Sequence, residues 1–339
     1  MSRTIVIGDI HGCHDELVAL IAIVEPTSSD LIVSVGDLVD RGPSGPEVVQ
    51  WFRDRPETVV LMGNHERKHV RDVLTYAQRI TKLQFGEGYA DARAWMMKLP
   101  YFYENDDVRV VHAAMVPGLP LAEQREEILC GSTSGEHELA KLIPEGHWHE
   151  HYTDDKPVVF GHHVTGPEPL LRDDRVYGID TGACHGMRLT AVTFPDRRVY
   201  SVPAREDYWA RIKREWQVPV LREFPWSETS FREIGEKLDG TRASTPELAD
   251  YVARMRGWVS ELDAAMSALL DALARKVAAI DPAEFTAAAN ATNVAPFLFQ
   301  LRAGRLTVDD LRKRLYSPAL VVDLAAKLDV PLPATTPPD

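Results

Sequence analysis

Cysteine is scarce in this sequence, and the few cysteines are widely spaced. Cys13, Cys130 and Cys184 are the only three among 339 residues. Three such residues are too few for a disulfide framework, and their spacing does not match a CxxC zinc site. The sequence therefore argues against a disulfide-stapled secreted domain and predicts a protein of the reducing cytoplasm.

Long apolar runs are also missing. No run approaches the roughly 20 apolar residues that a membrane-spanning helix needs. Ser2 and Arg3 lead straight into the first expected strand, without the apolar core of a signal peptide. We expect a soluble protein without a membrane partner.

Positive charge is in deficit, since 38 Lys and Arg face 51 Asp and Glu, a formal net charge of −13. This balance argues against a broad basic surface that grips extended duplex DNA or an anionic membrane. A local anion site built on metal ions remains compatible with it.

The hydrophobic share of 45% lets a chain of this length bury a large core. We expect a catalytic domain over residues 1–204, a mostly helical domain over 205–330 and a disordered tail over 331–339. The helical part contains apolar residues spaced by four and three. This seam indicates either an intramolecular helix pair, the more frequent outcome, or a homo-oligomer. Its members are Leu248, Val252, Met255, Val259, Leu262, Met266, Leu269 and Leu273.

The catalytic domain shows the alternating pattern of an α/β fold. Strands are expected at 3–7, 31–35 and 58–62, with helices at 15–24 and 47–52 between them. Residues 66–107 look like a helical cap or insertion. Further strands are expected at 108–111, 157–160 and 176–180, and a hairpin over 188–202 is expected to close a second sheet. The expected fold is therefore an α/β sandwich of two mixed β-sheets flanked by helices.

Polar side chains follow these strands at the point where each strand ends. Asp9 and His11 are two residues apart, so in an extended chain both point to one side and can reach one cation. With them, six such side chains could hold two divalent ions ~3.5–4 Å apart, bridged by one carboxylate. Imidazole together with carboxylate suits Mn, Fe, Zn or Ni better than Mg or Ca, and we favour Mn. The six are Asp9, His11, Asp37, Asn64, His112 and His162.

These residues lie in five ordered motifs that together resemble the calcineurin-like metallophosphoesterases. The likeness covers residues 3–204 and is to the branch of the Ser/Thr phosphoprotein phosphatases and symmetrical diadenosine tetraphosphatases. The motifs are Gly-Asp-Ile-His-Gly from Gly8, Gly-Asp-Leu-Val-Asp-Arg-Gly from Gly36, Gly-Asn-His-Glu from Gly63, Val-His-Ala from Val111 and Gly-His from Gly161.

The resemblance implies a role for each of these residues. It places Asp9, His11 and a bridging Asp37 on one metal ion, and Asp37, Asn64, His112 and His162 on the other. It implies that Arg41 binds the phosphate. It also makes His65 the proton donor to the leaving oxygen, with Asp40 orienting it.

A narrower likeness runs from Cys130 to Ala204. It is to the phosphatase module of bacterial polynucleotide kinase-phosphatases, which acts on phosphorylated RNA ends and generic phosphoesters. No GxxxxGK[ST] kinase loop precedes the domain. His163 stands where that module has threonine, Ala114 where it has glycine and His185 where it has an aromatic residue. These departures alter the expected pocket rim.

Other polar residues have open roles. Arg125 is the only arginine between His112 and His162, so it is interpreted as either a second phosphate-binding residue or a surface charge. His163 is a candidate substrate contact on the rim. Asp180 is left outside the direct ligands. The alternating histidines at 147, 149 and 151 indicate a solvated loop rather than a third metal site.

The sequence thus predicts a binuclear-metal-dependent phosphoesterase in which a hydroxide bridging the ions attacks phosphorus. Its expected substrate is a small phosphorylated nucleotide or RNA end. A Ser/Thr protein phosphatase or a symmetrical dinucleoside tetraphosphate hydrolase is the alternative within the same chemistry. A non-catalytic binding descendant is the alternative of another class, disfavoured because all the ligands and both acid-base residues are present.

Overall fold

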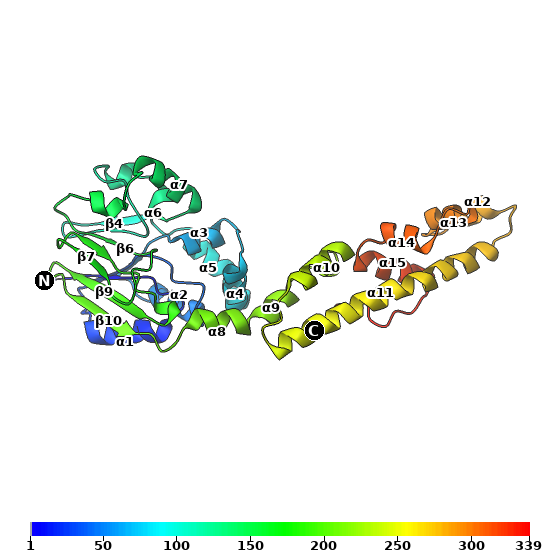
Figure 1. Cartoon of the computed structure of the whole chain (residues 1–339), viewed down its shortest axis with the longest axis horizontal. Coiled ribbons are helices and arrows are strands. Elements are labelled where there is room, and N and C mark those ends of the chain that lie inside the picture. The colour runs from blue at the N-terminus through cyan, green and yellow to red at the C-terminus, as the bar shows by residue number, and fades with distance from the viewer. Residues whose placement is uncertain (1) are drawn as a thin grey trace. The chain divides into compact units, whose positions relative to one another are not determined.

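A computed structural model describes residues 2–339 and divides them into two compact units, one ending at Trp216 and one spanning Gln217–Asp339. The first contains all the strands described, and the second contains helices only (Figure 1). The strands are β1 (Thr4–Ile7), β2 (Leu31–Ser34), β3 (Thr58–Val60), β4 (Phe102–Glu104), β5 (Arg109–Val111), β6 (Val158–Phe160), β7 (Leu170–Arg172), β8 (Val176–Gly178), β9 (Arg188–Phe194) and β10 (Val199–Pro203).

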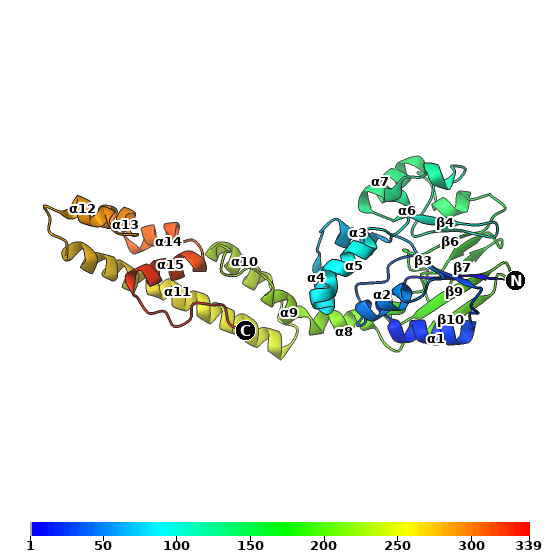
Figure 2. The same cartoon turned by 180° about the vertical axis from the view of Figure 1, so that it is seen from behind.

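Helices of the first unit connect and cover these strands (Figure 2). They are α1 (His14–Val24), α2 (Gly45–Arg53), α3 (Asn64–Val70), α4 (Tyr76–Phe85), α5 (Tyr89–Met96), α6 (Glu126–Leu129), α7 (Thr133–Leu142) and α8 (Tyr208–Glu215). The second unit consists of α9 (Gln217–Arg222), α10 (Phe231–Gly240), α11 (Pro246–Ala278), α12 (Phe285–Asn290), α13 (Ala295–Arg302), α14 (Val308–Arg314) and α15 (Pro318–Leu328).

The strands form two mixed sheets, which confirms the expected fold class. One has the order β10-β9-β1-β2-β3 and the other β4-β5-β6-β8-β7. β1, β2 and β3 are parallel, as are β5, β6 and β8. The expectation that the 188–202 hairpin closes the second sheet is wrong. β9 pairs antiparallel with β1, with Ile5 opposite Thr193, so the hairpin extends the first sheet.

The strand side chains alternate between two cores, as the period of two requires. Val6 of β1 and Val159 of β6 belong to the cluster between the sheets. Ile5 and Ile7 point the other way and pack with the apolar residues of α1 and α2. Phe160 faces outward from the second sheet, onto a cluster with α6. The sandwich is therefore buried on both outer faces.

The first unit extends beyond the boundary expected near Ala204. Tyr208 and Ile212 of α8 are buried. The Tyr208 hydroxyl donates to Glu16 Oε1 at 2.9 Å, and the Arg205 amide donates to the same oxygen at 3.1 Å. Because Glu16 lies on α1, these bonds attach residues 205–216 to the sandwich.

The long helix α11 organises the second unit. Thr245 caps it by accepting from the Leu248 amide at 3.2 Å, and Pro246 takes the first helical position. Its apolar seam packs in one cluster with residues of α13, α14 and α15, the intramolecular arrangement that the seam favoured. Leu332 and Ala334 pack against that cluster, although composition predicts disorder there. A homo-oligomer through these helices stays a prediction.

Among residues 2–339, no helix combines the length and the apolar character that crossing a membrane would take. The longest, α11, has 33 residues but carries charges along its length.

A buried carboxylate at the start of β2 gives the first unit a defined pH dependence. Asp30 is 3% exposed and accepts from the Arg3 amide at 2.7 Å, the Arg3 guanidinium at 2.8 Å and the Thr27 amide at 2.9 Å. Burial alone would raise the pKa of Asp30, but the bonds from Arg3 and Thr27 outweigh it and hold that pKa below its usual range.

We expect Asp30→Asn to lower the free energy of unfolding by about 1–3 kcal/mol at neutral pH. The folded pKa is depressed, so this contribution is complete above the unfolded pKa of about 3.9 and is lost as pH falls through the folded value. Urea unfolding at pH 7, 5 and 3 should show the two curves converging at low pH. Asp155→Asn, at a side chain that is 99% exposed, is the control. A difference that is constant with pH would contradict the assignment.

Candidate metal centre

The candidate ligands come from the carboxyl ends of parallel strands in both sheets. Asp9 and His11 follow β1, Asp37 follows β2, and Asn64 opens α3 after β3. His112 follows β5 and His162 follows β6. Because the two sheets face each other, their carboxyl ends meet at one rim of the sandwich. The structure brings all six residues together there.

Asp37 lies between two groups of potential metal ligands. It forms one group with His11 and His65, and another with Asp9 and His112, with ligand atoms within 4.8 Å of one another in each. Its Oδ2 is 3.6 Å from His11 Nε2, whereas its Oδ1 is 3.5 Å from His112 Nε2. One oxygen thus faces each group, which is the geometry of a bridging carboxylate.

The two deeply buried histidines are held in the tautomer that a metal ligand needs. His11 Nδ1 donates to the Val39 carbonyl at 2.8 Å, and His112 Nδ1 donates to the Val35 carbonyl at 3.0 Å. A carbonyl can only accept, so each Nδ1 carries the proton and each Nε2 keeps its lone pair. Burial lowers the pKa of both rings, that of His112 to about 4, and so keeps them neutral.

The other half of the centre converges on the amide of Asn64. Its Oδ1 is 3.2 Å from His112 Nε2 and 3.3 Å from His162 Nδ1. The His162 amide also donates to both carboxylate oxygens of Asp9, at 3.2 Å each. These contacts link ligands from both sheets in a single network.

The carboxylates carry the charge of this buried site. Burial raises the pKa of Asp9, and the charges of Asp180 and Asp37 raise it further. Burial opposes ionisation of Asp37 too, but the surrounding histidines, His112 first, hold its pKa below the usual range. Asp180 is buried behind Asp9 with its pKa raised by burial to about 6. Oxygen and imidazole donors packed this closely and buried this deeply fit divalent metal ions.

Several site residues adopt left-handed backbone conformations that side-chain-bearing residues seldom occupy. Their φ angles are +47° for His11, +51° for Asp37, +69° for Asp40, +66° for Arg41 and +68° for His162. Such conformations cluster at functional sites because the surrounding structure must hold them. The sequence analysis did not predict these backbone conformations.

Glu66, which sequence reasoning did not single out, supports this backbone. It is fully buried and accepts from the amides of Asp37 and Leu38 at 2.8 Å and of Gly63 at 3.2 Å. Burial and the nearby charge of Asp37 raise its pKa to about 8. Its carboxylate therefore ties the loop after β2 to the loop after β3.

The candidate acid His65 is positioned by a buried network. Its Nδ1 lies 2.6 Å from Asp40 Oδ2, and Asp40 Oδ1 lies 3.0 Å from His69 Nε2. Gln78 donates to Asp40 as well. Burial would raise the pKa of Asp40, but the bonds from His65 and His69 hold it well below its usual range. The proposed Asp40–His65 pair thus has the geometry its roles require.

His69 and Gln78 were missed by the sequence analysis. The available signal was spacing, since His69 stands four residues after His65 and shares its face of α3. Tyr89 completes the chain, with its hydroxyl 2.9 Å from His69 Nδ1.

Arg41 reaches the centre from the loop after β2. Its Nη1 is 3.1 Å from His11 Nε2, and its Nη2 is 3.0 Å from His65 Nε2. A guanidinium placed between a candidate ligand and the candidate acid can bind two oxygens of a phosphoryl group.

Arg125 lies on the surface, whereas His163 lies beside the centre in a group with Glu136 and His162. Arg125 pairs with Glu138 at 2.6 Å with a side chain that is 59% exposed, so the expectation that it contacts substrate is not supported. His163 lies next to His162, with ring centroids 4.5 Å apart, and lines a neighbouring pocket of mixed polarity. The rings of His147 and His149 stack at 5.3 Å, and the described residues show no separate metal-type group around them.

A glycine beside Asp9 gives a test of the centre that touches no ligand. A Cβ built on Gly161 would overlap Asp9 Oδ1. We expect Gly161→Ala to displace that carboxylate and to weaken the affinity for metal by at least about 10-fold. The metal content of the dialysed protein, measured by mass spectrometry, should fall as a result. Gly88→Ala, where nothing lies within 4 Å, is the control. Unchanged metal content in folded Gly161→Ala would contradict the placement of Asp9.

Comparison with known proteins agrees with this geometry. The family model described as Calcineurin-like phosphoesterase matches residues 2–196. The chain belongs to this family. As a calcineurin-like phosphoesterase it is a metal-dependent phosphoric ester hydrolase of a family that uses divalent metal ions, and its site contains candidate ligand groups for them.

Individual members show how far the likeness extends. The chain is 27% identical to a bis(5′-nucleosyl)-tetraphosphatase PrpE [asymmetrical] of Halalkalibacterium halodurans, covering 59% of this chain and 94% of that protein. It is 35% identical to a symmetrical bis(5′-nucleosyl)-tetraphosphatase of Cronobacter sakazakii, covering 58% and 93%. A crystal structure assigned to a candidate diadenosine tetraphosphatase matches with a TM-score of 0.50 and 26% identity, covering 60% and 94%.

Proposed function

We propose that this calcineurin-like phosphoesterase hydrolyses phosphate esters of short nucleotides or of RNA ends, using two divalent ions, preferably manganese. The observation that carries the two-ion proposal is the position of Asp37, with one carboxylate oxygen toward each group of ligands. Two such ions would supply an activated water for in-line attack and neutralise charge on the phosphoryl oxygens.

The residues of the chain take separate roles in this reaction. Asp9, His11 and Asp37 would hold one ion, and Asp37, Asn64, His112 and His162 the other. Arg41 binds and orients the phosphoryl group. His65 donates a proton to the departing oxygen, and Asp40 keeps its ring in place through the 2.6 Å contact.

A pocket next to the centre, lined by both aromatic and polar side chains, supports a nucleoside as the organic part of the substrate. Its volume is about 840 Å³, and its walls include the rings of Trp148, His149 and Phe160. The His149 and Phe160 rings stack at 5.6 Å. Glu136 and His163 line the side of this pocket nearest the candidate ligand His162. Flat rings beside a phosphate site suit a nucleobase.

A dinucleoside tetraphosphate is the second candidate substrate. It is favoured by the similarity of the chain to the bis(5′-nucleosyl)-tetraphosphatases of Halalkalibacterium halodurans and Cronobacter sakazakii. Both candidates would use the same metal centre, so they differ in what lies beyond the scissile phosphorus.

Hydrolysis of a substrate panel with added manganese tests this proposal. It should contain 2′-, 3′- and 2′,3′-cyclic mononucleotides, end-phosphorylated RNA, diadenosine tetraphosphate and a phosphopeptide, at 50 and 200 mM salt. We expect mononucleotides and RNA ends to react at similar rates with weak salt dependence, because the proposed site makes few phosphate contacts. A site making 6–10 phosphate contacts would instead lose ~10³–10⁵ in affinity over that range. A clear preference for phosphopeptides or for diadenosine tetraphosphate would replace the first candidate.

A further inference from the structure

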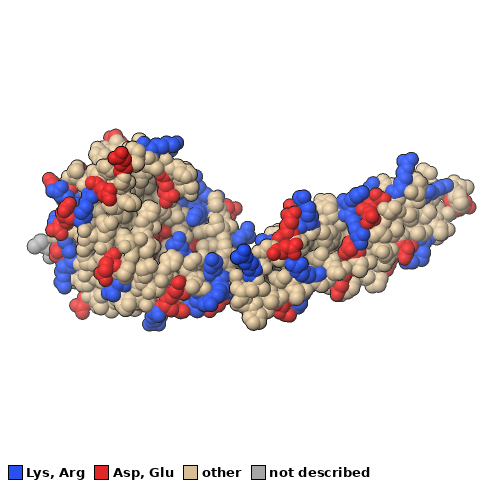
Figure 3. Space-filling model, in the orientation of Figure 1, with Lys and Arg blue, Asp and Glu red and all other residues tan. Residues whose placement is uncertain are grey.

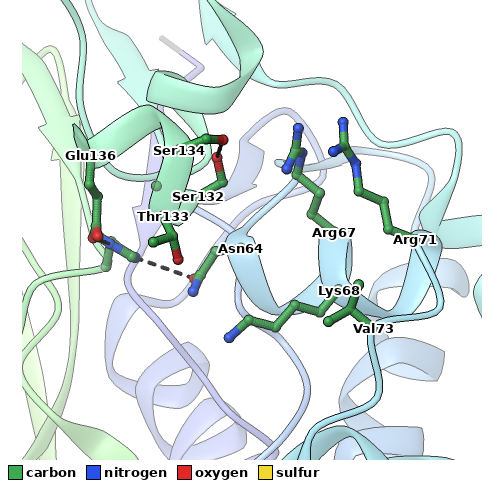
Figure 4. A pocket seen from close by; sticks show the side chains of 11 residues that line it. Asn64, Arg67, Lys68, Arg71, Val73, Ser132, Thr133, Ser134 and Glu136 are labelled. Atoms are coloured by element: carbon green, nitrogen blue, oxygen red, sulfur yellow. Dashed lines mark hydrogen bonds and ion pairs between the residues drawn. The ribbon is translucent and has the colours of Figure 1, made fainter. Parts of the chain in front are cut away.

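A second pocket adjoins the metal centre on the side of Asn64 and His162. Its volume is about 330 Å³, and both of these candidate ligands line it. Figure 4 shows its two walls, with Arg67 and Lys68 of α3 and Arg71 just after that helix on one side and Ser132, Thr133 and Ser134 across from them. The pocket is therefore continuous with the reaction site, and its other lining residues lie outside that site.

The α3 wall concentrates positive charge in a chain whose net charge is −13. Arg67 is only 6% exposed, and its Nη2 binds Glu127 Oε1 at 2.8 Å while its buried Nε has no partner. Arg71 shares Glu127 at 3.7 Å. Lys68 lines the pocket with no carboxylate within ion-pair distance in the described chain. Three cations with one shared carboxylate leave this wall short of negative charge.

The opposite wall offers hydrogen-bond donors. The Ser132 side chain caps α7 by accepting from the Gly135 amide at 3.2 Å. The amides of Thr133 and Ser134 precede that position, where helix geometry provides no carbonyl partner within the helix. The Ser132 hydroxyl donates to the Glu127 carbonyl, so the hydroxyl groups of Thr133 and Ser134 and the positive helix terminus are the groups on this wall suited to an oxyanion.

Glu136 is the carboxylate that lines this pocket. It lies 2.9 Å from His162 Nε2, at the side nearest the metal centre. An anion would therefore be favoured farther from Glu136, between the α3 cations and the start of α7. This separates it from the scissile phosphoryl group, which Arg41 and the metal ligands hold.

We propose that this pocket binds a second phosphoryl group of the same substrate, either a second monoester or part of an anhydride chain, so that nucleotides carrying such a group are preferred over nucleoside monophosphates. The inference rests on the proposed hydrolysis of nucleotide phosphates. It adds residues that bind the part of the substrate beyond the scissile phosphate. Lys68 and Arg71 are the accessible contacts, and Arg67 supports them from the buried side.

Competition by inorganic anions tests the pocket directly. The full-length manganese-loaded enzyme hydrolyses p-nitrophenyl phosphate while inorganic phosphate or tripolyphosphate is added at a fixed free manganese concentration. We expect tripolyphosphate to inhibit the wild type at least about tenfold more tightly than phosphate, the factor that one charged hydrogen bond supplies. Lys68→Ala combined with Arg71→Ala should bring the two inhibition constants together.

The controls separate this inference from the proposed function. Arg232→Ala, which removes a cation that is 83% exposed in the second unit, should leave the ratio of inhibition constants unchanged. Equal inhibition by both anions in the wild type, or an unchanged ratio in the double variant, overturns the second phosphate site. If the wild type does not hydrolyse p-nitrophenyl phosphate, the proposed function fails, and calorimetric titration of tripolyphosphate into wild type and double variant still decides the pocket.

Adenosine 3′,5′-bisphosphate and adenosine 5′-tetraphosphate then distinguish the two sources of a second phosphate. A loss of kcat/KM in the double variant confined to the tetraphosphate indicates a phosphoanhydride chain. A loss confined to the bisphosphate indicates two separate esters. Equal kcat/KM for both compounds and for adenosine 5′-monophosphate in the wild type would contradict the preference for additional phosphate.

Discussion

Asp37→Asn should lower turnover of p-nitrophenyl phosphate by at least about 100-fold. This loss is larger than the usual loss of activity when a residue that only hydrogen-bonds to a metal ligand is replaced. The carboxylate has one oxygen 3.6 Å from His11 Nε2 and the other 3.5 Å from His112 Nε2. An amide keeps one oxygen acceptor but loses the negative charge and the second oxygen. It cannot bridge two cations.

The exchange is well matched in other respects. Asparagine has nearly the same shape and tolerates the φ of +51° at this position, so the fold should persist. Metal content and circular dichroism should be measured beside turnover, with Asp155→Asn as the exposed control. A purified Asp37→Asn protein that retained more than a tenth of wild-type activity would refute the bridging role.

His65→Ala should show a loss that depends on the leaving group. A proton donor matters when the departing oxyanion is basic and contributes about 10²–10⁴ in such cases. With an alkyl phosphate we expect a loss in that range. p-Nitrophenolate leaves without protonation, so its ester should lose roughly tenfold or less. The contact between His65 Nδ1 and Asp40 makes Nε2, which lies 3.0 Å from Arg41 Nη2, the ring nitrogen that would carry the donated proton.

The measurement is kcat/KM for both substrates in wild type and variant. His137→Ala, at an exposed histidine of α7 that lines neither pocket, should change neither value. Equal losses on the alkyl and aryl phosphates would assign His65 to metal binding or to packing instead of acid catalysis.

The metal ligands were accessible from the sequence because each follows a short apolar strand in a local motif. Asp9, Asp37 and Asn64 can be placed at strand ends without knowing which strands pair. The geometry that brings His112 and His162 from the second sheet to the first needs the resemblance or the structure. The set of ligands was therefore predictable from local motifs, whereas their arrangement around two ions was predicted only through the family resemblance.

Long-range features account for the errors. The β9–β10 hairpin reads locally as a hairpin, and only its pairing with β1 reveals the sheet it joins. Arg125, left open between a phosphate contact and a surface charge, forms a surface pair with Glu138. The cations at the reaction rim lie at the end of α3, where Lys68 and the following Arg71 look like ordinary surface charges until the start of α7 is placed opposite them.

The left-handed backbone at His11, Asp37, Asp40, Arg41 and His162 has a consequence for exchange of amide protons. Each such residue costs about 1–2 kcal/mol in local conformational energy, so these loops should open more readily than the sandwich behind them. Ions that bind only the closed arrangement stabilise it by mass action. Divalent metal should therefore slow deuterium uptake in these loops selectively, and the slowest-exchanging amides of β1 and β6 should respond far less.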